Sequence, residues 1–161
     1  MRTFLDRLHD LKVKEVAQRQ IKVSEKSLSE QAETLGVAPD FRTNLIREPD
    51  APISLITEVK SKAPGRNNVE RLDPEAVVCD YEAGGAKAIS VLTDENWFGG
   101  SLETLEKVHA ATTLPLLHKE FIITPYQLLE GRVRGASAAL ILAYYFQETK
   151  LREIIAEAKM I

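Results

Sequence analysis

The spacing of apolar residues changes at about residue 50. Before that point the apolar positions recur at helical spacing, as in the run Phe4, Leu5, Leu8, Leu11, Val16. This pattern predicts one or two helices over residues 1–35, ending near Gly36, because glycine commonly follows a helix C-terminus. Pro39 and Pro49 bracket a less regular stretch that holds a short predicted helix, residues 41–46.

From about residue 50 onward, short apolar runs alternate with amphipathic segments. The predicted strands are residues 53–60, 88–92, 114–119 and 138–143. The predicted helices that follow them are residues 73–82, 102–111, 125–134 and 149–160. Four successive β–α units predict an α/β fold with a parallel sheet and right-handed crossovers. The strands read as continuous apolar runs, which is typical of strands buried on both faces.

The segments that follow the strands differ from those that precede them. SKAPGRNN, TDENWFGGS and EFIITP follow strands and are longer or richer in polar and aromatic residues than GGAK and RGAS, which precede strands. In a (β/α)8 barrel the loops after the strands build the active site. A doubly wound open sheet places its ligand at the same strand ends. The alternation by itself fits both folds.

Charge and composition exclude several classes of function. A formal net charge of −3 gives no basic field for a nucleic-acid partner. The longest apolar run, near residues 138–146, is far too short to span a membrane, and the first residues lack a signal-peptide core. The single cysteine, Cys79, cannot form an internal disulfide, and no Cys/His cluster has zinc-binding spacing. We therefore expect a cytoplasmic protein that binds neither nucleic acid nor membrane.

Three charged residues at predicted strand ends are the candidates for chemistry. Glu58 and Lys60 lie two residues apart, so both side chains point to the same face of the first strand. Lys119 ends the third strand. A lysine at such a position can protonate a carbonyl, hold a phosphate or form a Schiff base. The alternative is that these charges merely sit half in water at the strand ends.

Other polar and aromatic residues are interpreted as structural. His118 has the opposite parity to Lys119, so it is expected to face the helix layer. Cys79 lies beside two valines and is expected to be a small core residue. Trp97 and Phe98 are predicted to be loop aromatics, which either pack or stack on a planar ligand. The corner that begins at Gly99 is a weak phosphate-binding signal.

Several motifs resemble those of indole-3-glycerol-phosphate synthases, and the resemblance runs in register from about Pro52 to the C-terminus. TEVKSKAPG is similar to the family's first-strand AEIKKASPS, and SVLTDENWFGGS to SVLTDxxxFxGS. LPLLHKEFIITPYQLLEGRVRGASAALIL is similar to LPVLRKDFIIDPYQIxEARxxGADAVLLI. The N-terminal helices and the Asp40-Phe41 pair fit the extension that precedes the family's barrel. A phosphoribosylanthranilate isomerase is a weaker alternative, which the KEF and LTDENWF motifs disfavour.

The resemblance implies a (β/α)8 TIM barrel and a carboxy-lyase of tryptophan biosynthesis. Its reaction converts 1-(2-carboxyphenylamino)-1-deoxyribulose 5-phosphate, a phosphorylated small molecule, into indole-3-glycerol phosphate without a metal or an organic cofactor. Lys119 is implied as the general acid of ring closure, Lys60 as a group near the substrate carboxylate that acts in dehydration, and Glu58 as the residue that orients both lysines. The implied substrate-binding residues are Pro64, Phe98, Phe121, Leu140 and Leu142.

The sequence departs from the family pattern at several positions. Ala63 and Gly65 stand where the family has serines, which removes a hydroxyl near the substrate. His118 and Glu120 replace the usual Arg and Asp beside the catalytic lysine, and both are expected to face away from the site.

The chain also supplies only four of eight β–α units, so we expect a helical extension, residues 1–50, followed by a half-barrel, residues 51–161. A half-barrel has open edges. We therefore expect the chain to be inactive alone and to self-associate or bind a complementary C-terminal half. The alternative to an enzyme is a non-catalytic half-barrel that serves such an interaction.

Overall fold

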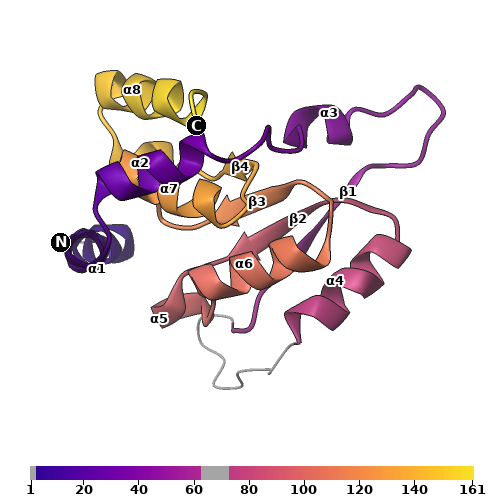
Figure 1. The fold of residues 1–161 in the computed structure, drawn as a ribbon, viewed down its shortest axis with the longest axis horizontal. Helices are drawn as coiled ribbons and strands as arrows, with labels where there is room; N and C mark the ends of the chain where they lie inside the picture. The colour runs from indigo at the N-terminus through magenta and orange to yellow at the C-terminus, as the bar shows by residue number, and fades with distance from the viewer. Residues whose placement is uncertain (1–2, 63–72) are drawn as a thin grey trace.

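The computed structural model of the chain describes residues 3–62 and 73–161, in which four parallel strands form one sheet (Figure 1). The strands are β1 (Leu55–Val59), β2 (Ala86–Leu92), β3 (Leu116–Lys119) and β4 (Ala138–Ala139). They pair in the order β1-β2-β3-β4, so each strand lies beside its neighbour in sequence. A doubly wound sheet reverses its strand order at a switch point. The sequential order is instead that of half of a (β/α)8 barrel.

Helices follow each of the four strands, and the longer ones pack against one another in a layer on one face of the sheet. They are α4 (Pro74–Ala83), α5 (Glu95–Phe98), α6 (Leu102–Ala111), α7 (Pro125–Val133) and α8 (Glu148–Ala158), with a short 3-10 turn η1 (Ala143–Tyr145). α4 packs on α6, α6 on α7, and α7 on α8. Their starts follow the capping rules: the Asp73 side chain accepts from Glu75 N at 3.2 Å, and Ser101 Oγ from Thr104 N at 3.0 Å.

Successive residues of each strand point to opposite faces of the sheet. One set packs under α4 and α6 in a fully buried core, whose members include Val59, Val78, Ile89, Val91, Leu105, Val108 and Leu116. Because successive strand residues point to opposite faces, Glu58, Ser90 and Leu117 share the other face. In a closed barrel this second face is the interior.

The N-terminal segment is helical, as predicted, and shares a core with the barrel units. It forms α1 (Phe4–Lys22), α2 (Glu25–Glu33) and α3 (Phe41–Leu45). A capping box between Thr3 and Asp6 starts α1. Leu28 of α2 packs with Val16 of α1 and with Tyr126 of α7. The helical segment before residue 50 and the β–α units after it therefore share a core. A domain boundary at residue 50 stays a prediction.

Three expectations about strand length and side-chain burial are wrong. β4 covers two residues instead of residues 138–143, because β3 ends at Lys119 and the chain after Leu140 turns into η1 at Ala143. β1 is not buried on both faces, since Leu55 and Ile56 are each about half exposed at the sheet edge. Cys79 is exposed, because α4 turns Val78 toward the sheet and its neighbour away from it. None of the described helices is both long and apolar enough to cross a membrane.

Candidate functional site

Glu58, Lys60 and Lys119 meet at the carboxyl ends of β1 and β3. Lys60 Nζ donates to Glu58 Oε1 at 2.6 Å, and Lys119 Nζ donates to Glu58 Oε2. Glu58 and Lys119 are 61 positions apart in sequence. Parallel pairing of β1 with β2 and of β2 with β3 brings them to the same side of the sheet. The structure thus unites the three predicted catalytic residues in one cluster, the mouth cluster.

The mouth cluster is half solvated and carries a surplus of positive charge. The side chains of Lys60 and Lys119 are 41% and 37% exposed, and that of Glu58 is 28% exposed. Partial burial favours the neutral form of Glu58, but hydrogen bonds and charges from Lys119 and Lys60 outweigh it and lower the pKa of this carboxyl. Two ammonium groups against one carboxylate leave one net positive charge, which suits an anionic ligand.

A mainly apolar cavity of about 190 Å³ adjoins Lys119. Its walls are formed by Leu92, Phe98, Lys119, Glu120, Phe121, Leu140 and Leu142. The Phe98 and Phe121 ring centroids lie 6.1 Å apart with an interplanar angle of 31°. Four of the five predicted substrate-binding residues are therefore assembled beside the predicted general acid. The fifth, Pro64, lies outside the described residues, as do Ala63 and Gly65.

Phe98 is positioned by the short helix α5 and not by a loop, which corrects the expectation for Trp97 and Phe98. Asp94 Oδ1 caps this helix and accepts from Trp97 N at 2.6 Å and Phe98 N at 3.2 Å. The chain then turns sharply against β2: a Cβ at Gly100 would overlap the carbonyl oxygen of Leu92. Glycine is required at this corner by close approach of two backbone segments.

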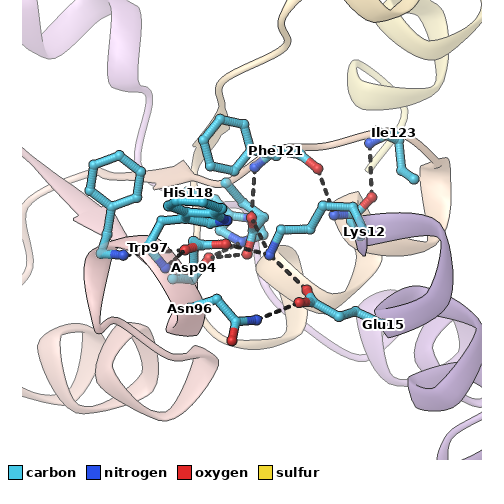
Figure 2. Close-up of polar contacts among 12 residues, drawn as sticks. Lys12, Glu15, Asp94, Asn96, Trp97, His118, Phe121 and Ile123 are labelled. Carbon is cyan, nitrogen blue, oxygen red and sulfur yellow. Dashed lines mark hydrogen bonds and ion pairs between the residues drawn. The ribbon is translucent and has the colours of Figure 1, made fainter. Parts of the chain in front are cut away.

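A second charged cluster, absent from the sequence prediction, adjoins the cavity wall at Glu120. Figure 2 shows its members Lys12, Glu15 and Asp94 close together. Lys12 of α1 is 1% exposed, and its Nζ lies 2.6 Å from Asp94, 2.8 Å from Glu15 and 3.1 Å from Glu120. Burial alone lowers the pKa of Lys12, but the three carboxylates more than offset this and raise it. We call these four residues the buried cluster.

The sequence did contain a signal for the buried cluster. Leu8, Lys12 and Val16 follow one another at intervals of four residues, and all three are buried on one side of α1. A lysine within the apolar stripe of an amphipathic helix requires a charged partner. α1 as a whole lies at the carboxyl ends of the strands, where Phe4 packs edge-on against Trp97 at 4.8 Å and His9 contacts Tyr145 at 5.4 Å.

His118 faces the helix layer, as predicted from its parity. It is buried against Gly131 of α7, where a Cβ would overlap the imidazole ring. Burial first, and then the charges of Arg19 and Lys12, lower the pKa of His118 to about 3, so the ring is neutral. The Thr93 hydroxyl donates to Glu120 Oε2 at 3.2 Å, so it accepts from His118 Nε2 at 2.9 Å. His118 is thus a packing residue.

Glu120 only partly fits the expectation that it faces away from the site. Its carboxylate points to Lys12 and accepts from Phe121 N at 2.7 Å, while the residue also forms part of the cavity wall. Within residues 3–62 and 73–161, no group of three or more His, Cys, Asp or Glu side chains is placed to hold a metal ion.

Comparison with known proteins identifies one family over most of the chain. The sequence profile of the family described as indole-3-glycerol phosphate synthase matches residues 5–161. The chain belongs to this family. An indole-3-glycerol phosphate synthase of Streptomyces griseus subsp. griseus is 39% identical over 158 residues, which cover 98% of this chain and 58% of the relative. That family has the (β/α)8 barrel fold, so the four described units correspond to its first half.

Two further relatives show the same relation in length. An indole-3-glycerol phosphate synthase of Rhodopirellula baltica is 41% identical over 144 residues, 89% of this chain and 55% of the relative. One from Roseiflexus sp. is 38% identical over 163 residues, 97% of this chain and 60% of the relative. The chain thus spans somewhat more than half the length of the curated relatives it matches. The matched names are those of the synthase, which agrees with the motif-based choice against the isomerase.

Proposed function

We propose that this chain provides the catalytic lysines and the aromatic pocket of an indole-3-glycerol-phosphate synthase. The substrate would be 1-(2-carboxyphenylamino)-1-deoxyribulose 5-phosphate, and the products would be indole-3-glycerol phosphate, CO₂ and water. The observation that carries the proposal is the cavity that combines Lys119 with the rings of Phe98 and Phe121. A planar carboxyphenylamino group fits such a wall, and its carboxylate fits the positive mouth cluster.

Each charged residue then has a defined task in ring closure. The ring carbon that bears the carboxylate attacks the ribulosyl carbonyl carbon, and the carbonyl oxygen takes a proton from Lys119 to become a hydroxyl. Loss of CO₂ restores the aromatic ring. Lys60 lies near the departing carboxylate and donates the proton with which the hydroxyl leaves as water. The carbon between this centre and the nitrogen loses a proton, which forms the double bond of the indole. Glu58 holds both ammonium groups in place through hydrogen bonds to each of them.

The reaction requires groups beyond those in the described strands. The mouth cluster provides one side of a barrel mouth, whereas a phosphorylated substrate also needs an anchor for its phosphate, which barrels commonly build after strands seven and eight. We propose that four further β–α units complete the site, and that the 161 residues alone turn over substrate slowly or not at all. No cofactor is part of the proposal, and cytoplasmic residence stays a prediction.

A fluorescence assay for indole-3-glycerol phosphate tests the proposal. The chain would be assayed alone and after mixing with the remaining C-terminal part of the Streptomyces griseus relative, supplied as a separate polypeptide. We expect product in the mixture and a rate about 10²–10⁴-fold lower after Lys119→Ala. The rate should be unchanged after Lys87→Ala, which removes an exposed lysine at the amino end of β2, away from the mouth cluster. A wild-type rate after Lys119→Ala would contradict the assignment of the acid.

The edge of the sheet favours a second candidate function, that of a half-barrel that associates with another chain. Leu55 and Ile56 are about half exposed on β1, and Ile53 just before it is 77% exposed. Open strand edges with apolar side chains are sites of pairing. Sedimentation of the purified chain at micromolar concentration should show a dimer if the chain pairs with itself. A strictly monomeric mass would contradict self-association and leave a complementary half as the partner.

A further inference from the structure

The buried cluster connects α1 to both aromatic walls of the cavity. Lys12 Nζ contacts Asp94 Oδ2 at 2.6 Å and Glu120 Oε1 at 3.1 Å, and both carboxylates are almost fully buried (Figure 2). Asp94 comes just after β2, and Glu120 comes just after β3. One ammonium group therefore joins the ends of two neighbouring strands from outside the sheet.

Each of these carboxylates also binds the backbone of a cavity aromatic. Asp94 Oδ1 accepts from the backbone N–H of Phe98, and Glu120 Oε1 accepts from that of Phe121. The first of these hydrogen bonds holds Phe98 at the end of α5, and the second holds Phe121 two residues after β3. Lys12 thus contacts both of the carboxylates that accept from the backbone of Phe98 and Phe121.

We propose that Lys12 is a positioning residue of the site, which fixes the spacing of the Phe98 and Phe121 rings through Asp94 and Glu120. The proposal rests on the function proposed above for the cavity. It makes α1 part of the binding site, although Lys12 is not among the residues that line the cavity. Docking of the N-terminal helix and the shape of the aromatic pocket are therefore coupled.

A second ion pair on the same helix provides the matched comparison. Arg19 of α1 donates to Glu130 of α7 at 2.8 Å, so it also docks the helix onto the barrel units. Glu130 has no hydrogen bond to either cavity phenylalanine among the described contacts. If Lys12 only docks α1, removing Lys12 and removing Arg19 should change the aromatic pocket to a similar extent. If Lys12 positions the two rings, only its removal should change the pocket.

The single tryptophan offers a readout that is independent of activity. Trp97 N donates to Asp94, and the indole ring packs edge-on against Phe4 of α1. Its fluorescence therefore reports both the cap of α5 and the docking of α1. Anthranilate, a planar aromatic carboxylate, serves as the probe of the cavity itself, with affinity measured by isothermal titration.

The experiment compares Lys12→Met with Arg19→Met in the full chain. For Lys12→Met we expect a red shift and stronger acrylamide quenching of Trp97, with native far-ultraviolet circular dichroism, and roughly tenfold weaker anthranilate binding. For Arg19→Met we expect wild-type values of both. If Lys12→Met does not fold, Asp94→Asn replaces it, because the amide oxygen still caps α5 while the nearest of the three charges that attract Lys12 is lost. The same direction of change is then expected.

The outcomes separate the two proposals. Wild-type Trp97 emission and quenching in a folded Lys12→Met or Asp94→Asn variant would overturn the positioning role. Equal changes from Arg19→Met would do the same, because they would reduce Lys12 to a docking contact. Failure of the wild-type chain to bind anthranilate would count against the proposed function, while the tryptophan measurements would still decide the role of Lys12.

Discussion

The mouth cluster and the buried cluster are built from the same chemical groups in opposite proportions. At the mouth, one carboxylate, Glu58, lies between two lysines whose side chains are more than a third exposed. In the buried cluster, one fully buried lysine, Lys12, lies among three carboxylates. Because the mouth cluster is solvated, its lysines can exchange their contacts with Glu58 for contacts with a ligand at little cost. Separating the buried cluster would instead leave charges without partners in the protein interior, which is strongly destabilising.

The largest stability effect should come from the buried cluster. Lys12→Met leaves Asp94 and Glu120 buried without their cation, which should lower the free energy of unfolding by about 3–5 kcal/mol. Urea unfolding followed by circular dichroism measures this loss. If the free energy of unfolding changed by less than about 1 kcal/mol, which is the range for exposed ion pairs, the two clusters would not differ in their contribution to stability.

The next effect concerns the pH dependence that His118 imposes. The pKa of His118 is lowered from 6.5 to about 3 by burial and by the nearby Arg19 and Lys12. Between pH 6.5 and about 3, His118 is protonated in the unfolded chain but neutral in the folded chain. The contribution of His118 to the free energy of unfolding is therefore highest above pH 6.5 and decreases as the pH falls from 6.5 toward 3. The limiting slope is about 1.4 kcal/mol per pH unit.

Urea unfolding between pH 4.5 and 7 should show this slope in the wild-type chain, and His118→Gln should reduce it. Glutamine can keep the hydrogen bond to Thr93 but does not titrate. An identical slope in both proteins would show that other groups cause the acid sensitivity.

A smaller effect is expected when one lysine of the mouth cluster is removed. Lys60→Met should change the free energy of unfolding by less than about 1 kcal/mol, because its ion pair with Glu58 is solvated. Lys107→Met is the control, since Lys107 forms a similarly exposed pair with Glu103 at 2.8 Å. A loss for Lys60→Met as large as that for Lys12→Met would show that the mouth cluster is structural and would weaken its assignment to catalysis.

The smallest expected effect is the response of the two clusters to salt. At an ionic strength of about 1 M the screening length falls to about 3 Å. The small stability difference between wild type and Lys60→Met should then vanish, while the difference for Lys12→Met should persist because Lys12, Asp94 and Glu120 are almost fully buried. Urea titrations at low and high NaCl compare the two, and a salt-sensitive Lys12 would imply that its cluster is solvated.

Local patterns in the sequence were sufficient for the elements and for the mouth cluster. Alternating β–α periodicity predicted the strands, and strand parity placed Glu58 and Lys60 on one face and His118 on the other. Lys119 was placed by the same pattern at the end of the third strand. The resemblance added its role as the acid and the aromatic walls, which the structure assembles around one cavity. These features depend on spacing within a strand or on a family motif, and both are visible in one sequence.

The features that could not be predicted depend on contacts between distant segments. Lys12 is separated from Asp94 and Glu120 by more than 80 residues, and only the docking of α1 at the strand ends brings them together. Cys79 follows two valines, and these apolar neighbours suggested that it is buried. In the structure α4 is oriented so that Val78 lies in the core and Cys79 is exposed. The length of β4 depends on neighbouring strands, which the residues of β4 do not specify.

The turnover of Lys119→Ala tests the central claim most directly, namely that the half-solvated mouth cluster supplies the acid for ring closure. The rate of indole-3-glycerol phosphate formation would be measured at saturating substrate with the barrel completed by the C-terminal part of the Streptomyces griseus relative. The account predicts a rate about 10²–10⁴-fold lower than wild type, as for loss of a general acid, with the unfolding free energy nearly unchanged. A folded Lys119→Ala protein with the wild-type rate would contradict it.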